Sequence, residues 1–148
     1  CIRDSSLTRV DLSGTRALPR EIKLLSDGFG HCKFPLRELS VNGRGLGLES
    51  CASLLEPLRD CPLEVLELRK NDICGVKPTG REPFSTYVLK IICELIARPG
   101  GGLLKLNLQE NSLLGNDVYS SEAVVLLVEA LKSEHCRLEE LHLPLQAS

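Results

Sequence analysis

Cysteine and histidine are the residue types of this chain that could act as nucleophiles, proton carriers or metal ligands. The seven cysteines lie at positions 1, 32, 51, 61, 74, 93 and 136, and the three histidines at 31, 135 and 142. The closest two cysteines are ten residues apart, so the chain has no C-x-x-C pair of the kind that binds zinc. No Ser/His/Asp or Cys/His arrangement follows from the spacing. We therefore expect a protein that is not an enzyme and has no metal and no cofactor.

The glycine-rich stretches could in principle cradle a phosphate group. Gly43, Gly45 and Gly47 alternate with other residues, as in some phosphate loops, but no Gly-Lys-Ser/Thr follows them. A turn explains their spacing. The run Gly100-Gly101-Gly102 is typical of a connection between a helix and a strand.

Two cysteines recur at one position relative to the leucines that follow them. Cys61 precedes Leu63 by two residues, and Cys136 precedes Leu138 by two. A small side chain that recurs in this way indicates a small buried slot. We interpret the cysteines as structural thiols; a disulfide framework or a metal site is the alternative.

The elements that would position these side chains follow from a repeated pattern. Residues 103–113 read Leu-Leu-Lys-Leu-Asn-Leu-Gln-Glu-Asn-Ser-Leu, which is the L-x-x-L-x-L-x-x-N-x-L signature of a leucine-rich repeat. Leu106 and Leu108 alternate with polar residues, as in a half-buried strand. Asn111 can hydrogen-bond to backbone groups of the following turn. Similar copies begin at residues 7, 36, 63, 103 and 138.

The block Cys-x-Leu-Glu-x-Leu-x-Leu occurs at 61–68 and again at 136–143. It resembles the ribonuclease-inhibitor-like subfamily of leucine-rich repeat proteins. The resemblance implies one α/β domain over residues 1–148, a solenoid with a parallel sheet of about five strands on its concave side and helices on its convex side. It also implies a role in binding proteins. Thr15 and Arg44 replace the usual Asn or Cys, so we expect irregular turns in the first two repeats.

The repeats predict strands centred on residues 10–12, 39–41, 66–68, 106–108 and 141–143, with helices between them. The first helix should begin near Pro19 and stop near Gly28, and Pro57 should shorten or kink the second. The third should cover 87–98. In the fourth, over 121–133, Val124, Val128 and Leu131 form the stripe that we expect to be buried.

Residues that flank the buried leucines should point to the concave face of the sheet. That face carries four basic and five acidic side chains, among them Arg9, Lys70, Glu110 and Glu140. A balanced face suits a mixed protein surface better than a polyanion; the alternative is a merely solvated sheet face. The residues that we predict to bind a partner here are Asp11, Glu38, Ser40, Asn42, Glu67, Arg69, Lys105, Asn107, Gln109 and His142.

The third and fourth repeats are longer than the others, with inserts at about 74–85 and 114–120. Because parallel repeats stack in register, both inserts should emerge on one rim of the sheet. Three of the five aromatic residues of the chain lie in or beside them. The side chains that we predict to bind a partner at this rim are Lys77, Arg81, Phe84, Tyr87, Asp117 and Tyr119. The alternative is that the aromatic rings anchor the loops to the core.

Composition narrows the choice of partner. A net charge of −2 gives no concentrated basic surface for nucleic acid, and no apolar run is long enough to span a membrane. We see no signal-peptide pattern, and the chain lacks methionine even at position 1. We therefore expect an intracellular protein, most simply cytoplasmic, with nuclear and cytoskeletal locations as alternatives. The chain should be a trimmed piece of a longer one.

These observations favour a noncatalytic protein-interaction module, part of a scaffold or receptor, that binds through the concave face and the insert rim. One alternative is a GTPase-activating or other enzyme-accessory domain, for which Arg81 would be the arginine that completes an active site. Another is a self-assembly module, because uncapped repeat ends expose apolar faces.

Overall fold

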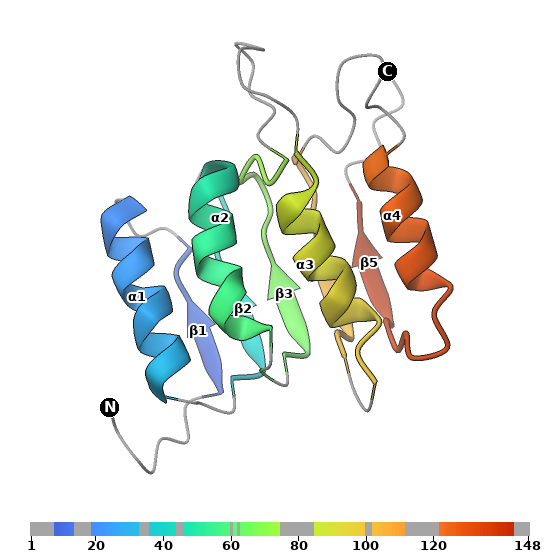
Figure 1. The fold of residues 1–148 in the computed structure, drawn as a ribbon, viewed down its shortest axis with the longest axis horizontal. Coiled ribbons are helices and arrows are strands. Elements are labelled where there is room, and N and C mark those ends of the chain that lie inside the picture. The colour runs from blue at the N-terminus through green and yellow to red at the C-terminus, as the bar shows by residue number, and fades with distance from the viewer. Residues whose placement is uncertain are drawn as a thin grey trace.

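The computed structural model describes residues 8–13, 19–32, 36–43, 46–59, 61, 63–74, 85–99, 102–111 and 122–143. Within these residues strands and helices alternate along the chain (Figure 1). In order, the elements are β1 (Arg9–Asp11), α1 (Pro19–Cys32), β2 (Glu38–Ser40), α2 (Gly47–Leu55), a short 3₁₀ helix (Glu56–Leu58), β3 (Val65–Glu67), α3 (Tyr87–Ile96), β4 (Lys105–Asn107), α4 (Glu122–Leu131) and β5 (Glu140–His142).

The five strands form one parallel sheet in the order of the chain, β1-β2-β3-β4-β5. The central residue of each strand lies beside that of the next, so that one apolar row crosses the sheet. This row consists of Val10, Leu39, Leu66, Leu106 and Leu141. The predicted parallel sheet is confirmed, and each strand lies one residue earlier in the chain than the predicted range.

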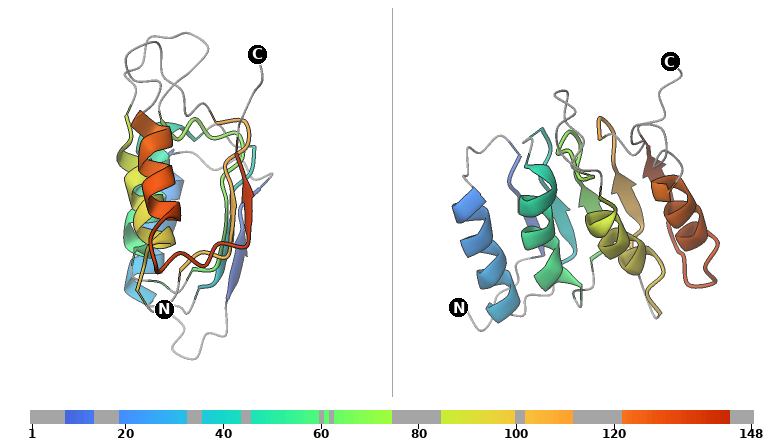
Figure 2. Two further views of the ribbon diagram at one scale, coloured as in Figure 1. Left: turned by 90° about the vertical axis from the view of Figure 1, so that its right-hand side faces the viewer. Right: turned by 45° about the horizontal axis from the view of Figure 1, so that its top comes forward.

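The helices all cover one face of the sheet and leave the other open (Figure 2). The core lies between the two layers, where Leu39, Leu66 and Leu106 are at most 1% exposed. The arrangement is an α/β leucine-rich repeat solenoid, as the sequence predicts. We call the uncovered side the open sheet face.

Of two predicted helix boundaries, the one near Pro57 is confirmed and the one at Gly28 is wrong. α2 gives way at Leu55 to the 3₁₀ helix that contains Pro57, as expected of a proline that cannot donate to the α-helical ladder. The predicted stop of α1 at Gly28 is wrong, because the helix continues to Cys32. A glycine ends a helix when it adopts a left-handed conformation, and Gly28 remains helical.

The predicted buried stripe of α4 is also wrong by one residue. Ala123, Leu127 and Ala130 are the buried side chains, whereas Val128 is 40% exposed. The buried set faces the sheet, and the predicted set lies on the flank of α4. The flank of a helix is buried only when another helix packs beside it.

One flank of α3 is covered by the next helix, α4. It begins 35 residues before α4, and its residues Val88, Ile92 and Leu95 are buried. Leu89 and Ile96 on its flank are buried too, and Cys93 beside them is half-buried. The thiol of Cys93 donates a hydrogen bond to the carbonyl of Leu126 in α4, at 3.6 Å. α4 therefore covers this flank of α3.

Buried asparagines tie the turns of the third and fourth repeats together. The Asn111 amide donates to the carbonyl of Leu68 at 2.7 Å, and its Oδ1 accepts from the backbone N–H groups of Asn71 at 3.0 Å and Ile73 at 3.2 Å. Asn71 repeats the role one repeat earlier, donating to the Val41 carbonyl and accepting from the N–H of Leu46. The predicted role of Asn111 is confirmed, and these bonds hold the edge of the sheet from which the inserts leave.

Candidate functional site

The register of the sheet arranges the residues of the open sheet face, among them most of those predicted to bind a partner, in two rows. The first row consists of Arg9, Glu38, Val65, Lys105 and Glu140, and the second of Asp11, Ser40, Glu67, Asn107 and His142. Strands lie about 4.8 Å apart, so each row crosses the whole sheet. Asn42, Arg69 and Gln109 follow the second row in the turns.

Ion pairs link neighbouring strands along the first row. Arg9 Nε lies 3.4 Å from Glu38 Oε2, and Lys105 Nζ lies 3.6 Å from Glu140 Oε2. His142 Nε2 lies 2.9 Å from Glu140 Oε1 within the last strand. Exposed pairs of this kind contribute about 0–1 kcal/mol each. Their main effect is therefore to orient side chains rather than to hold the sheet together.

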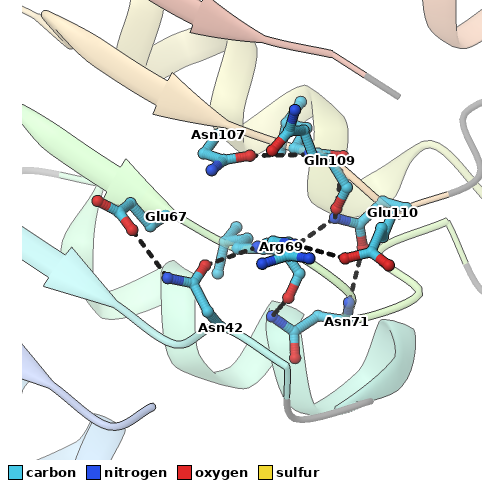
Figure 3. Close-up of polar contacts among 10 residues, drawn as sticks. Asn42, Glu67, Arg69, Asn71, Asn107, Gln109 and Glu110 are labelled. Atoms are coloured by element: carbon cyan, nitrogen blue, oxygen red, sulfur yellow. Dashed lines mark hydrogen bonds and ion pairs between the residues drawn. The ribbon is translucent and has the colours of Figure 1, made fainter. Parts of the chain in front are cut away.

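A hydrogen-bonded group in the turns at the ends of β2, β3 and β4 joins three repeats (Figure 3). The Asn42 amide donates to Glu67 Oε2 at 2.8 Å, and Asn42 Oδ1 accepts from the backbone N–H of Arg69 at 3.0 Å. The Arg69 guanidinium pairs with Glu110 of the next repeat. In the same view the N–H of Gln109 donates to Asn107 Oδ1 at 3.0 Å. Side chains fixed in this way lose little freedom when a partner binds.

The residues of the face differ in how much surface they offer. Arg69 and Lys105 are exposed, and Glu67 and Asn107 are half-buried. Ser40 is 8% exposed, so it contributes little beyond its hydroxyl group. Val65 interrupts the first row with a half-buried apolar side chain between the two ion pairs. The face is thus polar with a shallow apolar centre.

The pKa values of two carboxylates on the face are lowered. The backbone N–H of Ser13 donates to Asp11 Oδ1 at 2.9 Å, and this hydrogen bond lowers the pKa of Asp11. The pKa of Glu140 is lowered chiefly by its hydrogen bond with His142 and then by the positive charge of Lys105. Both groups are therefore fully ionised at neutral pH and present negative charge on the face.

Of the predicted rim, only Tyr87 lies among the described residues. It is the first residue of α3 and is 38% exposed. Lys77, Arg81, Phe84, Asp117 and Tyr119 lie outside the described residues. The predicted aromatic cluster, and the arginine on which the enzyme-accessory alternative rests, therefore stay predictions.

The first insert is closed at its base, and α3 begins beside α4. The N–H of Ser85 donates to the carbonyl of Cys74 at 2.9 Å, which closes the first insert at its base. Thr86 Oγ1 donates to Glu122 Oε1 at 3.4 Å, so the helices that follow the two inserts begin side by side. The first insert is therefore closed at its base, and residues 114–120 of the second lie outside the described residues.

The cysteines have the environment of structural thiols. Burial raises the pKa of the Cys51 and Cys74 thiols to about 12 and that of Cys93 to about 11. Cys61 and Cys136, the recurring pair, pack half-buried against the core. A thiol with such a high pKa is almost wholly protonated at neutral pH and is a poor nucleophile.

Other kinds of site have little support within the described residues. No group of three or more His, Cys, Asp or Glu side chains there could hold a metal ion. No described helix is long and apolar enough to cross a membrane. Every buried side-chain nitrogen or oxygen in the same residues has a hydrogen-bond partner.

Sequence reasoning missed how the polar residues of the face connect. It placed Asn42, Glu67 and Arg69 on one face without recognising that they bond to each other and to Glu110.

Comparison with known proteins gives relatives of the repeat type. No family model matches the chain. It is 26% identical over 162 residues to the human NACHT, LRR and PYD domains-containing protein 14, and 26% identical over 163 residues to protein 13 of the same name. The alignments include 96% and 95% of this chain but only 14% of each relative. The chain therefore spans about one seventh of the length of these relatives.

A solved structure has the same architecture. The tropomodulin C-terminal domain from Caenorhabditis elegans superposes with a TM-score of 0.71, over 99% of this chain and 78% of that one. The two sequences are 15% identical, so the likeness concerns the fold. Together with the repeat-containing relatives, it supports a leucine-rich repeat protein.

Proposed function

We propose that the chain is a noncatalytic protein-interaction module of the ribonuclease-inhibitor-like kind, which binds a protein partner through the open sheet face and the rim of the two inserts. The observation that carries the proposal is the set of polar side chains on that face, which are partly or fully exposed yet held in place by one another. A preorganised surface binds with a smaller loss of entropy than a mobile one.

The charges of the face define the partner further. Arg9, Arg69 and Lys105 each lie beside an acidic side chain of the same chain. Asp11 and Glu67 instead bond to neutral groups, the Ser13 N–H and the Asn42 amide. Both belong to the second row, two strands or about 10 Å apart. A protein surface with basic side chains at that spacing would complement them.

The rim would add affinity to this electrostatic recognition. Aromatic side chains are frequent anchors of protein interfaces, and Tyr87 lies partly exposed at the start of α3, just after the first insert. Lys77, Arg81, Phe84, Asp117 and Tyr119 complete the proposed surface.

An intracellular location accords with the reduced thiols of Cys51 and Cys74.

Reversal of charge on the face tests the sheet part of the proposal. Proteins captured from cell extract by the wild-type chain are quantified against those captured by Glu67→Lys and by Lys90→Glu. Lys90 is an exposed residue of α3 on the helix side, so it supplies a matched control. We expect Glu67→Lys to lose a partner that Lys90→Glu retains. Equal capture by both variants would contradict binding at the open sheet face.

Removal of the first insert tests the rim. Because Cys74 and Ser85 are already hydrogen-bonded, replacing 75–84 by a two-residue turn should leave the fold intact. The shortened chain should melt like the wild type and lose capture of the partner. If it unfolds, the insert is structural; if it folds and still captures the partner, the sheet face alone carries binding.

A further inference from the structure

Asn42 is followed by a glycine, and no other asparagine of the sequence is. The others are Asn71, Asn107, Asn111 and Asn116, which precede aspartate, leucine, serine and aspartate. The side-chain amide of an asparagine can react with the backbone nitrogen of the residue that follows it. Glycine shields that nitrogen least, because it has no Cβ and its backbone is the most free to adopt the reactive conformation. By local sequence, Asn42 therefore has the most reactive amide of the chain.

The turn after β2 favours this glycine. Gly43 lies three residues after the end of β2 and has a φ of 71°, in the left-handed region that glycine adopts readily. A Cβ at this position would meet nothing within 4 Å, so the conformation rather than a lack of space favours glycine. Lys70 and Glu110 hold the same place after β3 and β4, with φ of 60° and 57°, but they follow arginine and glutamine. Among these three turns, the reactive pair therefore belongs to the second repeat alone.

The reaction open to such a pair is deamidation. The backbone nitrogen of Gly43 attacks Cγ of Asn42 and forms a new C–N bond, while the bond from Cγ to Nδ2 breaks. The proton of the Gly43 nitrogen leaves with the amide group as ammonia, and a cyclic imide remains. Water then adds to one of the two imide carbonyls and opens the ring to aspartate or isoaspartate. Either product carries a carboxylate where the amide was.

Three hydrogen bonds engage the reacting groups in the folded chain. Nδ2 of Asn42 donates to Glu67 Oε2 at 2.8 Å, and Oδ1 accepts from the N–H of Arg69 at 3.0 Å, so the side chain is held from both sides (Figure 3). The N–H of Gly43, whose proton the reaction removes, donates to the carbonyl of Arg69 at 2.7 Å. All three bonds lead to the third repeat. The attack therefore requires that the turn first part from its neighbour.

The product cannot rebuild these contacts. An ionised carboxylate at position 42 has no hydrogen to donate, and it would face the carboxylate of Glu67 where the amide now bonds at 2.8 Å. Two like charges so close repel each other. Isoaspartate also adds a carbon atom to the main chain before Gly43, which displaces the N–H of Gly43 from the carbonyl of Arg69. A single conversion therefore leaves the hydrogen-bonded group of Figure 3 open.

We infer that Asn42 is a site of spontaneous deamidation that its contacts with the third repeat hold closed. While Asn42 and Gly43 bond to Glu67 and Arg69, the amide persists. Each opening of the turn exposes the amide to reaction, and closing the turn does not reverse a conversion. The converted chain has one more negative charge on the open sheet face and no longer fixes the backbone of Arg69. This holds whatever binds to the face.

Mass spectrometry of the aged chain tests the inference. The 148-residue chain is kept in mildly alkaline buffer, with and without denaturant, and its peptides are analysed over time for exchange of amide for carboxylate. In denaturant, Asn42 should convert faster than every other asparagine. In the folded chain its conversion should be at least about tenfold slower, because it then depends on opening of the turn. Asn107, half-buried on the same face but followed by leucine, is the matched control and should persist in both.

Two outcomes of this measurement would overturn the inference. Equal rates for Asn42 in the folded and denatured chain would show that the contacts with Glu67 and Arg69 do not hold the site closed. Faster conversion of Asn71 or Asn111 than of Asn42 in denaturant would show that the reactive site lies elsewhere.

An exchange of donor and acceptor tests what the conversion does to the group. Asn42→Asp reproduces one product and should lower the melting temperature at neutral pH, since two carboxylates then meet. Glu67→Gln in the same chain should restore it, because the new amide at position 67 donates to the new carboxylate at position 42. Glu67→Gln alone is the control and should melt like the wild type, since its side-chain oxygen still accepts from Asn42. No recovery in the double variant would contradict loss of this contact on conversion.

Discussion

The middle and the first repeat of this solenoid carry the same pattern and differ in what lies beside them. Leu68 and Leu12 hold equivalent positions after β3 and β1, yet Leu68 is 0% exposed and Leu12 is only half-buried. In the middle, helices and strands cover both sides of each repeat, whereas the first repeat has a described neighbour on one side. A repeat of this kind completes its burial only through its neighbours.

The turns show the same difference. Asn71 and Asn111, in the third and fourth repeats, are at most 1% exposed and bond to backbone groups of adjacent repeats. The first two repeats have Thr15 and Arg44 at this position, both outside the described residues. The second repeat instead receives its turn contacts from Asn71, through the Val41 carbonyl and the Leu46 N–H. The asparagines of the third and fourth repeats thus hold the turns of adjacent repeats as well as their own.

The largest effect should come from truncating equivalent leucines. Leu68→Ala should lower the free energy of unfolding by about 2–5 kcal/mol, the range for a fully buried leucine. Leu12→Ala should cost about 1 kcal/mol, because its side chain is already partly exposed. Denaturant melts of both variants measure the difference. Equal losses would mean that the first repeat is packed as completely as the middle.

The next effect concerns the asparagines. Asn111→Ala should cost about 1–3 kcal/mol, since it leaves the buried N–H groups of Asn71 and Ile73 without an acceptor. Asn107→Ala, on the open sheet face, is the control for removal of an amide. If the two variants melt alike, the buried asparagine does not hold the turns together.

A smaller effect is expected on the open sheet face. Glu67→Ala and Asn107→Ala should each change stability by no more than about 0.5 kcal/mol, as is typical of surface positions. Their side chains are half-buried and bond to groups that water can also reach. Losses near those of Leu68→Ala would show that the two faces of the strands have been assigned backwards.

The smallest effect should appear in the dependence on pH. The lowered pKa of Glu140 means that its ionised form favours the folded chain; this contribution is present at neutral pH and is lost as the pH falls through the lowered pKa. The wild type should therefore exceed Glu140→Gln in stability at pH 7, and the difference should shrink as the pH falls below 4.5, the ordinary pKa of the group. A difference that persists in acid would exclude the His142 and Lys105 contacts as its cause.

Periodicity was enough to predict the strands, their parallel order and the role of Asn111, because each depends on a pattern that recurs along the chain. It could not separate Val124, Val128 and Leu131 on the flank of α4 from the buried stripe, since both are apolar at helical spacing. Only the position of α3 decides between them. The bonds among Asn42, Glu67 and Arg69 likewise depend on register across strands, which a single repeat does not contain.

Amide hydrogen exchange tests the dependence of each repeat on its neighbours most directly. The N–H groups of Leu12, Val41, Leu68 and Leu108 make equivalent bonds of 2.8–2.9 Å to the next strand, so their exchange rates compare the four junctions at matched geometry. Val41 and Leu68 should exchange more slowly than Leu12 and Leu108. Exchange of Leu12 as slow as that of Leu68 would contradict the account.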